Sequence, residues 1–159
     1  MNSAFYINSF TFDYVETWSF NRDDDATMYD LVKAEDLFQP GSKRTGTFKN
    51  DHPTAARIKE ILQTEIEESM KFLCAPIYRE ALVFYDRNDK VVSLLSICLT
   101  CLDLHAAPHN RIRGDYKAFE WLRRLFQGLG HEIENPEYSI IEDIQRQLEK
   151  VKKRYKRNG

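Results

Sequence analysis

This chain of 159 residues has few long apolar runs, little excess of one sign of charge and an odd number of cysteines. No stretch approaches the 18 consecutive apolar residues of a membrane-spanning helix, and the N-terminus lacks the basic and apolar regions of a signal peptide. The net charge is −2 with mixed signs, so no global field favours nucleic acid or a membrane surface. Three cysteines are an odd count without the spacing of a disulfide framework, so we expect a cytoplasmic protein.

The sequence also lacks the common catalytic motifs. It contains no G-x-S-x-G and no H-E-x-x-H, and the glycine-containing stretch 39–51 lacks the G-x-x-x-x-G-K-[ST] spacing of a phosphate loop. The acidic run at 21–25 has neither the central glycine nor the closing glutamate of a calcium loop. We expect it to be a solvated loop that caps a short helix over 26–33. These absences indicate a protein that is not an enzyme.

Enough apolar residues are present, 42% of the chain, for one folded domain spanning 1–159. Residues 6–20 alternate between aromatic and polar side chains, which predicts one long strand or two shorter ones. Glu16 falls on the aromatic parity. It is either turned into water by a bulge or held as a half-buried carboxylate beside a pocket, and the sequence leaves both open.

The most apolar part of the chain is 80–102, where two strongly apolar runs flank the polar turn 86–89. Strands that are apolar on both parities are covered on both faces of a sheet. The sequence therefore predicts a β-hairpin at about 80–102 in the centre of an antiparallel sheet. Arg79 and Glu80, at the start of this hairpin, are expected to form a partly buried ion pair.

Three segments show the spacing of amphipathic helices. The first opens at Pro53 and covers 53–72, the second covers 115–129 with Asp115 as its cap, and the third covers 136–159 and ends in a basic run. The first two are expected to pack on the sheet and the third to lie at the periphery. Cations at a helix C-terminus complement its dipole, so we do not expect the basic run to bind nucleic acid. The fold class predicted is α+β.

The remaining segments, 39–52 and 105–114, contain proline, glycine and polar residues and are predicted to be surface loops. The first is the longest such stretch, and long loops often carry a contact surface.

The cysteines are the clearest chemical feature. Cys98 and Cys101 form a C-x-x-C, Cys74 precedes the hairpin, and His105 follows it. Thiolates and imidazole are natural zinc ligands, and a C-x-x-C is also a redox motif. Against both, two cysteines three residues apart in a regular strand point to opposite faces, and free cysteines commonly behave as small buried apolar residues. If the strand ends before Cys98, the two thiols can act together, whereas if it runs through Cys101 they are packing residues.

The sequence C-A-P-I-Y-R-E-A-L-V-F-Y-D, followed by a second strand and I-C-x-x-C, resembles a pattern in uncharacterised small bacterial proteins. The later L-G-H resembles the end of a helix in the same proteins. The resemblance covers about residues 74–133. It implies a protein of the immunity type in bacterial competition systems, which binds a partner and carries no catalytic residues.

Together these patterns predict a non-enzymatic cytoplasmic protein that binds and neutralises a bacterial toxin, without a cofactor and with its oligomeric state open. A zinc or redox module built on the C-x-x-C is the alternative. Charged segments suited to electrostatic steering are the candidate contacts with the partner. These residues are Asp23, Asp24, Asp25, Lys43, Arg44, Glu67 and Glu68.

Overall fold

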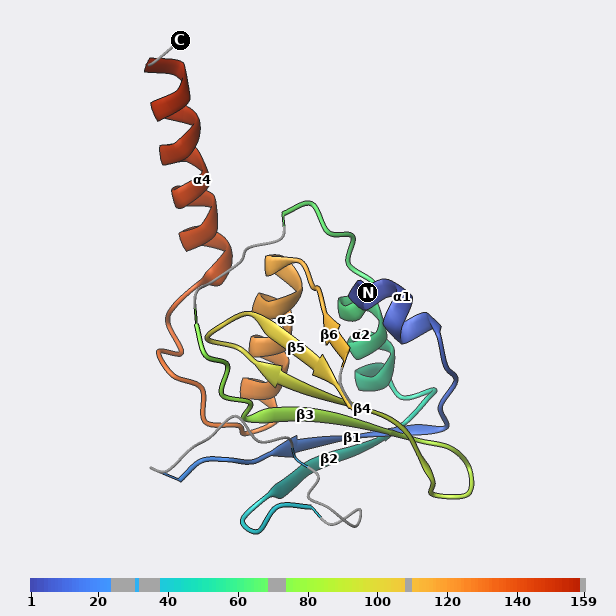
Figure 1. Ribbon diagram of the computed structural model, residues 1–159. Helices are drawn as coiled ribbons and strands as arrows, with labels where there is room; N and C mark the ends of the chain where they lie inside the picture. Colours follow the sequence, from blue (N-terminus) through green and yellow to red (C-terminus); the bar gives the residue numbers. More distant parts are fainter. Residues whose placement is uncertain (24–30, 32–37, 69–73, 108–109, 158–159) are drawn as a thin grey trace.

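The computed structural model describes residues 1–23, 31, 38–68, 74–107 and 110–157 (Figure 1). Its helices and strands confirm the predicted α+β class. In chain order they are α1 (Ser3–Asn8), β1 (Tyr14–Ser19), β2 (Lys43–Lys49), α2 (Pro53–Leu62), β3 (Glu80–Tyr85), β4 (Val91–Cys98), β5 (Asp103–Ala106), β6 (Asn110–Ile112), α3 (Tyr116–Gly128) and α4 (Ile140–Arg157).

The six strands form one antiparallel sheet in the order β2-β1-β3-β4-β5-β6. The predicted hairpin, β3 with β4, therefore occupies the centre of the sheet, as its apolar sequence indicated. Every residue of β3 is buried. The second strand ends at Cys98 rather than near 102, because a turn over 99–102 leads directly into β5.

The sheet has two apolar faces. One, which we call the helix face, packs against α1, α2 and α3, and its largest strand residues include Leu82, Phe84 and Ile97 (Figure 1). The opposite face carries a smaller core that includes Val83 and Leu94. Because β3 and β4 contribute to both cores, both of their parities are apolar.

The predicted strand over 6–20 is wrong in its first part, because residues 6–8 end the helix α1 and the strand β1 covers only 14–19. Asn2 caps this helix by accepting a hydrogen bond from the backbone N–H of Phe5 at 2.7 Å. Tyr6 and Ile7 are buried against the helix face, and the Tyr6 ring meets Phe10 at 5.3 Å between centroids. A contact between residues four positions apart is typical of a helical turn, but the alternation of aromatic residues in this segment predicted a strand instead.

Both predicted loops contain strands. Within 39–52, residues 43–49 form β2, which pairs with β1 at the edge of the sheet, with an irregularity in register between Thr17 and Trp18. Within 105–114, residues 110–112 form β6, which pairs with β5 at the other edge. Short edge strands carry few apolar residues, so neither shows a strong apolar pattern.

The first predicted helix, 53–72, ends much earlier than expected, since α2 stops at Leu62. Beyond it, the buried carboxylate of Asp115 accepts hydrogen bonds from the backbone N–H groups of Glu67 and Glu68, at 3.0 and 3.2 Å. These N–H groups are thus bound outside a helix. The last part of the prediction, 69–72, lies outside the described residues, as does most of the helix predicted over 26–33.

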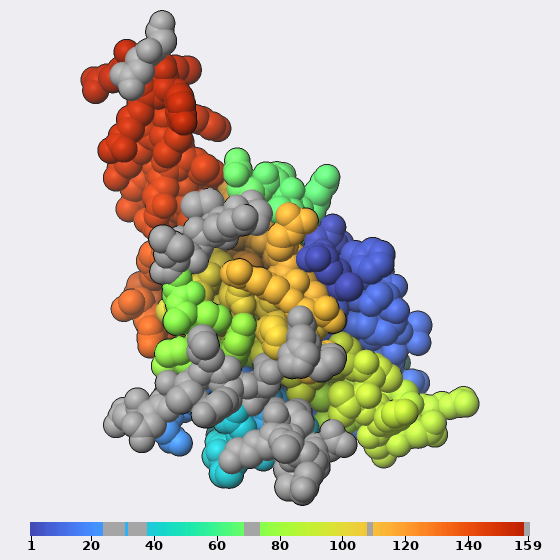
Figure 2. Space-filling model, in the orientation of Figure 1, coloured from blue at the N-terminus to red at the C-terminus, as the bar shows by residue number. Residues whose placement is uncertain are grey.

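The other two predicted helices are both present in the structure. The α3 helix confirms the prediction over 115–129, with Asp115 accepting from the N–H of Lys117 at 2.9 Å as its N-cap. The α4 helix starts at Ile140 rather than at Pro136, because Ser139 caps it. Its end projects from the body, with residues 151–157 exposed (Figures 1 and 2). None of the described helices is long and apolar enough to cross a bilayer.

Candidate functional site

A half-open cavity of about 300 Å³ lies between the end of the central hairpin and the segment that links α3 to α4. This volume is at the lower end of the range for small-ligand sites. Most of its apolar lining comes from three places in the chain. These residues are Ile77 before β3, Leu99 and Leu102 in the turn after β4, and Ile133, Ile140 and Ile144 around the start of α4.

One wall of the cavity is held by a disulfide. Cys74 and Cys101, which are 27 positions apart in the sequence, are bonded, with their Cα atoms 5.8 Å apart. The bond joins the segment 74–79, which contributes Ile77 to the cavity, to the turn 99–102. The expectation that the cysteines form no disulfide is therefore wrong. The turn after Cys98 brings Cys101 to Cys74, which an uninterrupted strand would not allow.

The opposite wall is held by Arg123, a side chain of α3 that is almost fully buried. Its guanidinium donates hydrogen bonds to the backbone carbonyls of Glu134, Asn135 and Tyr138, which fixes the segment entering α4. A planar guanidinium has five donors in a fixed geometry, so it suits this task. Arg123 falls four residues after Phe119, on the same side of the helix as this apolar residue.

Glu120 completes this arrangement. Its buried carboxylate accepts a hydrogen bond from the backbone N–H of Ile140 at 2.8 Å, at the start of α4. The same carboxylate pairs with Arg124 at 2.9 Å. A negative group at a helix N-terminus is stabilised by the helix dipole. Two side chains of α3 thus fix the position of α4.

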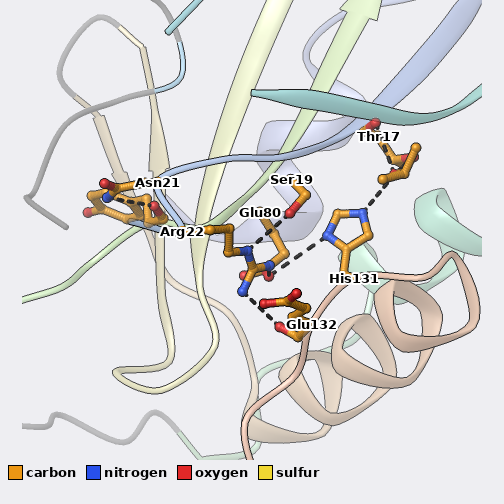
Figure 3. Close-up of polar contacts among 9 residues, drawn as sticks. Thr17, Ser19, Asn21, Arg22, Glu80, His131 and Glu132 are labelled. Carbon is orange, nitrogen blue, oxygen red and sulfur yellow. Dashed lines mark hydrogen bonds and ion pairs between the residues drawn. The ribbon is translucent and has the colours of Figure 1, made fainter. Parts of the chain in front are cut away.

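At the back of the cavity lies a network around Glu80 (Figure 3). Arg22 donates to the Glu80 carboxylate, to the Ser19 hydroxyl at 3.0 Å and to the carbonyl of Glu132 at 2.7 Å. Glu80 is 3% exposed, so this ion pair is largely desolvated on the carboxylate side. The expected ion pair between Arg79 and Glu80 is wrong, because the distant Arg22 takes that place.

His131 lies beside Glu80 (Figure 3), and its side chain has no exposed surface. Its Nε2 is 2.7 Å from the hydroxyl of Thr45, which in turn is 2.8 Å from the hydroxyl of Thr17. Its Nδ1 is 3.8 Å from Glu80, too far for a hydrogen bond. A carboxylate, an imidazole and a hydroxyl in sequence resemble a catalytic relay. However, the His131 side chain has no exposed surface, so this cluster connects β2, β3 and the end of α3 instead of facing a substrate.

The three cysteines predicted as metal ligands come together at the turn 99–102, but two of them are bonded to each other. The disulfide uses Cys74 and Cys101, and Cys98 is a buried free thiol that accepts from the backbone N–H of Cys101 at 3.4 Å. His105 lies on β5 opposite Ser96, with its ring 5.8 Å from that of Tyr78. Among the described residues, no group of three or more His, Cys, Asp or Glu is arranged to hold a metal.

The predicted partner contacts are separated from one another. Asp23, Lys43 and Arg44 are exposed, the last two on edge strand β2, but Arg44 is already paired with Glu16 at 2.8 Å. Glu67 and Glu68 are exposed beside Asp115, which follows the opposite edge strand β6. Asp24 and Asp25 lie outside the described residues. These positions do not form one surface patch.

Glu16 is buried, so the interpretation that a bulge turns it into water is wrong. It is buried more deeply than the half-buried carboxylate of the second interpretation, and it does not line the cavity described above. On the face opposite the helices its carboxylate accepts from Tyr85 and Trp18, both at 3.0 Å, in addition to Arg44. Tyr85 stacks on Tyr14 with 4.7 Å between ring centroids. Hydrogen bonds from the two aromatic side chains and from the guanidinium offset the free-energy cost of burying the Glu16 carboxylate.

This cluster predicts a loss of stability at high pH. Burial, and then the hydrogen bond to Glu16, raise the pKa of Tyr85; burial and Asp89 raise the pKa of Tyr14 to about 12. A raised folded-state pKa means that stability is complete below the unfolded value of 10 and falls as pH rises through the folded values. We expect native absorbance titration to show Tyr85 ionising at lower pH in Glu16→Gln than in the wild type. Wild-type tyrosines that all titrate near the ordinary value would contradict this.

Arg22, Arg79 and Arg123, which line the cavity, were not selected as site residues from the sequence. Arg123 had a detectable signal, because a charged residue on an apolar helical stripe needs a buried partner. Arg22 had none, since its partner Glu80 is 58 residues away.

Comparison of the chain with known protein families, with curated proteins and with solved structures found no match. The fold and the cavity together define an α+β domain with a preformed, mainly apolar site.

Proposed function

We propose that this chain is a non-enzymatic binding domain that takes part of a partner protein into the cavity beside α4. The observation that carries the proposal is the construction of the cavity: a disulfide holds one wall and Arg123 holds the other. A site fixed before binding loses less entropy when the partner arrives. In addition, the His131 cluster, which most resembles catalytic machinery, is enclosed.

We further propose that the partner is a bacterial toxin and that the domain neutralises it in the cytoplasm. The resemblance of residues 74–133 to immunity-type proteins supports this, as does a surface of mixed charges suited to steering a partner. The disulfide weighs against a cytoplasmic location, because the cytoplasm keeps most thiols reduced. The redox state of the cysteines in the living cell therefore tests the location.

The direct experiment is to express the product of the neighbouring gene with this protein, then measure binding and protection of growth. We expect nanomolar affinity and protection. Thr100→Trp, which places a large ring at the cavity, is expected to abolish both, whereas the exposed Lys59→Ala on α2 is the control. A neighbouring product that neither binds nor is neutralised, or a Thr100→Trp variant that binds normally, would contradict the proposal.

A second function is favoured by the meeting of all three cysteines at one turn. We propose thiol–disulfide exchange, in which the Cys98 thiolate attacks the Cys101 sulfur, a Cys98–Cys101 bond forms, and Cys74 leaves as a thiolate that takes up the proton. Cys74 is exposed, so a protein thiol can reach it. Zinc bound by these three thiols and His105 is the alternative, and it requires the reduced protein.

One set of measurements separates these outcomes. Acid quenching of cells followed by alkylation gives the number of free thiols, peptide mapping gives the bonded pair, and elemental analysis gives the zinc content. A mixture of Cys74–Cys101 and Cys98–Cys101 bonds supports exchange, and a stoichiometric metal with three thiols supports zinc. One fixed Cys74–Cys101 bond without metal would contradict both.

A further inference from the structure

Arg79 is the one arginine lining the cavity that has no ion pair or side-chain hydrogen bond among the described residues. It is half-buried directly before β3. Its backbone is fixed on both sides, since its N–H donates to Ile97 at 3.3 Å and its carbonyl accepts from Phe20 at 3.0 Å. A partly desolvated guanidinium on a rigid strand end is a ready receptor for an anion.

The other charges inside the cavity are compensated. Arg22 pairs with Glu80, and Arg123 donates to backbone carbonyls. Asp143 accepts from the Tyr138 hydroxyl and from a glutamine amide, both at 2.9 Å. The remaining carboxylates lining the cavity, Glu132 and Glu134, belong to exposed residues and are hydrated. Arg79 is therefore the cation for which a ligand has to supply the counter-charge.

The surroundings of Arg79 define the rest of the ligand. The cavity walls are largely aliphatic, and the volume of about 300 Å³ accommodates one apolar side chain or a short hydrocarbon. A planar guanidinium matches the two oxygens of a carboxylate better than it matches a neutral group. An apolar group next to a carboxylate satisfies both parts of the site at once.

We propose that the cavity binds a carboxylate attached to a compact apolar group, with the carboxylate on Arg79 and the apolar group between the turn 99–102 and the start of α4. The C-terminal residue of a protein and a small free carboxylic acid both have this chemistry. The assignment rests on the proposed binding function and names the chemical group that the cavity selects.

The test pairs two ligands with two proteins. Ac-Ala-Ala-Leu with a free carboxylate and the same peptide with a C-terminal amide are titrated into the wild type and into Arg79→Gln, followed by amide chemical shifts. We expect the free acid to bind the wild type at least about tenfold more tightly than the amide, because a hydrogen bond to a charged group exceeds the ~1.4 kcal/mol that a factor of ten requires. In Arg79→Gln we expect the difference to disappear.

Two further variants control the result. Arg79→Lys keeps the charge and is expected to retain part of the preference for the acid. Thr100→Trp keeps Arg79 but obstructs the cavity, and it is expected to lose both ligands. Arg79 has no side-chain partner to lose, so its variants are expected to have the melting temperature of the wild type.

The second part of the test compares the binding of octanoate with that of octanamide. Tighter binding of the peptide acid identifies a protein C-terminus as the source of the carboxylate, and tighter binding of octanoate identifies a small carboxylic acid. Equal binding of acid and amide, or an acid preference that survives Arg79→Gln, would overturn the assignment. Failure of the neighbouring gene product to bind overturns the protein-binding proposal alone, since the ligand titrations do not depend on that partner.

Discussion

Replacing Arg123 with methionine is expected to lower the free energy of unfolding by about 2–4 kcal/mol. Methionine preserves most of the apolar stem, so the change isolates the guanidinium. Its loss removes donors to three backbone carbonyls, those of Glu134, Asn135 and Tyr138. Since these carbonyls belong to exposed residues, water replaces part of the lost interaction, which keeps the expected cost below that of a fully buried network.

The neighbouring residue provides the matched control. Arg124→Met makes the same chemical change one position along α3, but the side chain of Arg124 is 65% exposed and, within the described part of the chain, its one ion pair is with Glu120. We expect a loss of about 1 kcal/mol or less, as for other partly solvated pairs. Urea unfolding followed by circular dichroism measures both variants. Equal losses would show that the carbonyl contacts of Arg123 do not hold the wall of the cavity.

The centre of the fold was predictable because hydrophobic burial dominates there. The strands at 80–85 and 91–98 are largely apolar on both parities, and only the middle of a covered sheet buries both sides of a strand. The α3 helix was predictable for the same reason, with the additional signal of Asp115 at its cap. Both elements are determined by local sequence and by contact with a large apolar surface.

The edges were not predictable from local patterns. The β2 strand is held by backbone pairing with the more distant β1, and β6 by pairing with the preceding strand β5; the side chains of both edge strands are mostly exposed or half-buried. The segment after α2 is bound by Asp115, whose carboxylate accepts hydrogen bonds from the N–H groups of Glu67 and Glu68, 48 and 47 positions earlier in the chain. Such long-range polar contacts leave no periodic trace in the sequence.

The candidate site combines parts that the sequence predicts with parts that it does not. Its apolar lining comes from predictable elements, but its polar groups meet only in three dimensions: Arg22 meets Glu80 across 58 residues, and Cys74 meets Cys101 across 27. Neither case set out from the sequence is met as stated, because the strand includes Cys98 but stops before Cys101. The strand ends at Cys98, so the cysteines share a turn, and this turn forms a wall of the cavity.

Reduction of the Cys74–Cys101 disulfide is expected to lower the free energy of unfolding by about 3 kcal/mol. The chain-entropy relation gives this order of magnitude for a closed loop of the length between the two cysteines. The bond also joins segment 74–79 to the turn 99–102, so reduction loosens the wall that carries Arg79. We therefore expect weaker binding of an apolar carboxylate in the reduced protein, even under conditions where the protein stays folded.

The experiment compares a double variant with a control that leaves the loop closed. Cys74→Ser with Cys101→Ser opens the loop, whereas Cys98→Ala removes the buried free thiol alone. Adding a dithiol reductant should destabilise the wild type and Cys98→Ala by similar amounts and leave the double variant unchanged. If the reductant leaves the wild type as stable as before, the bond does not hold the cavity. The walls then depend on Arg123 and on apolar packing alone, and the double variant should bind the carboxylate as tightly as the wild type.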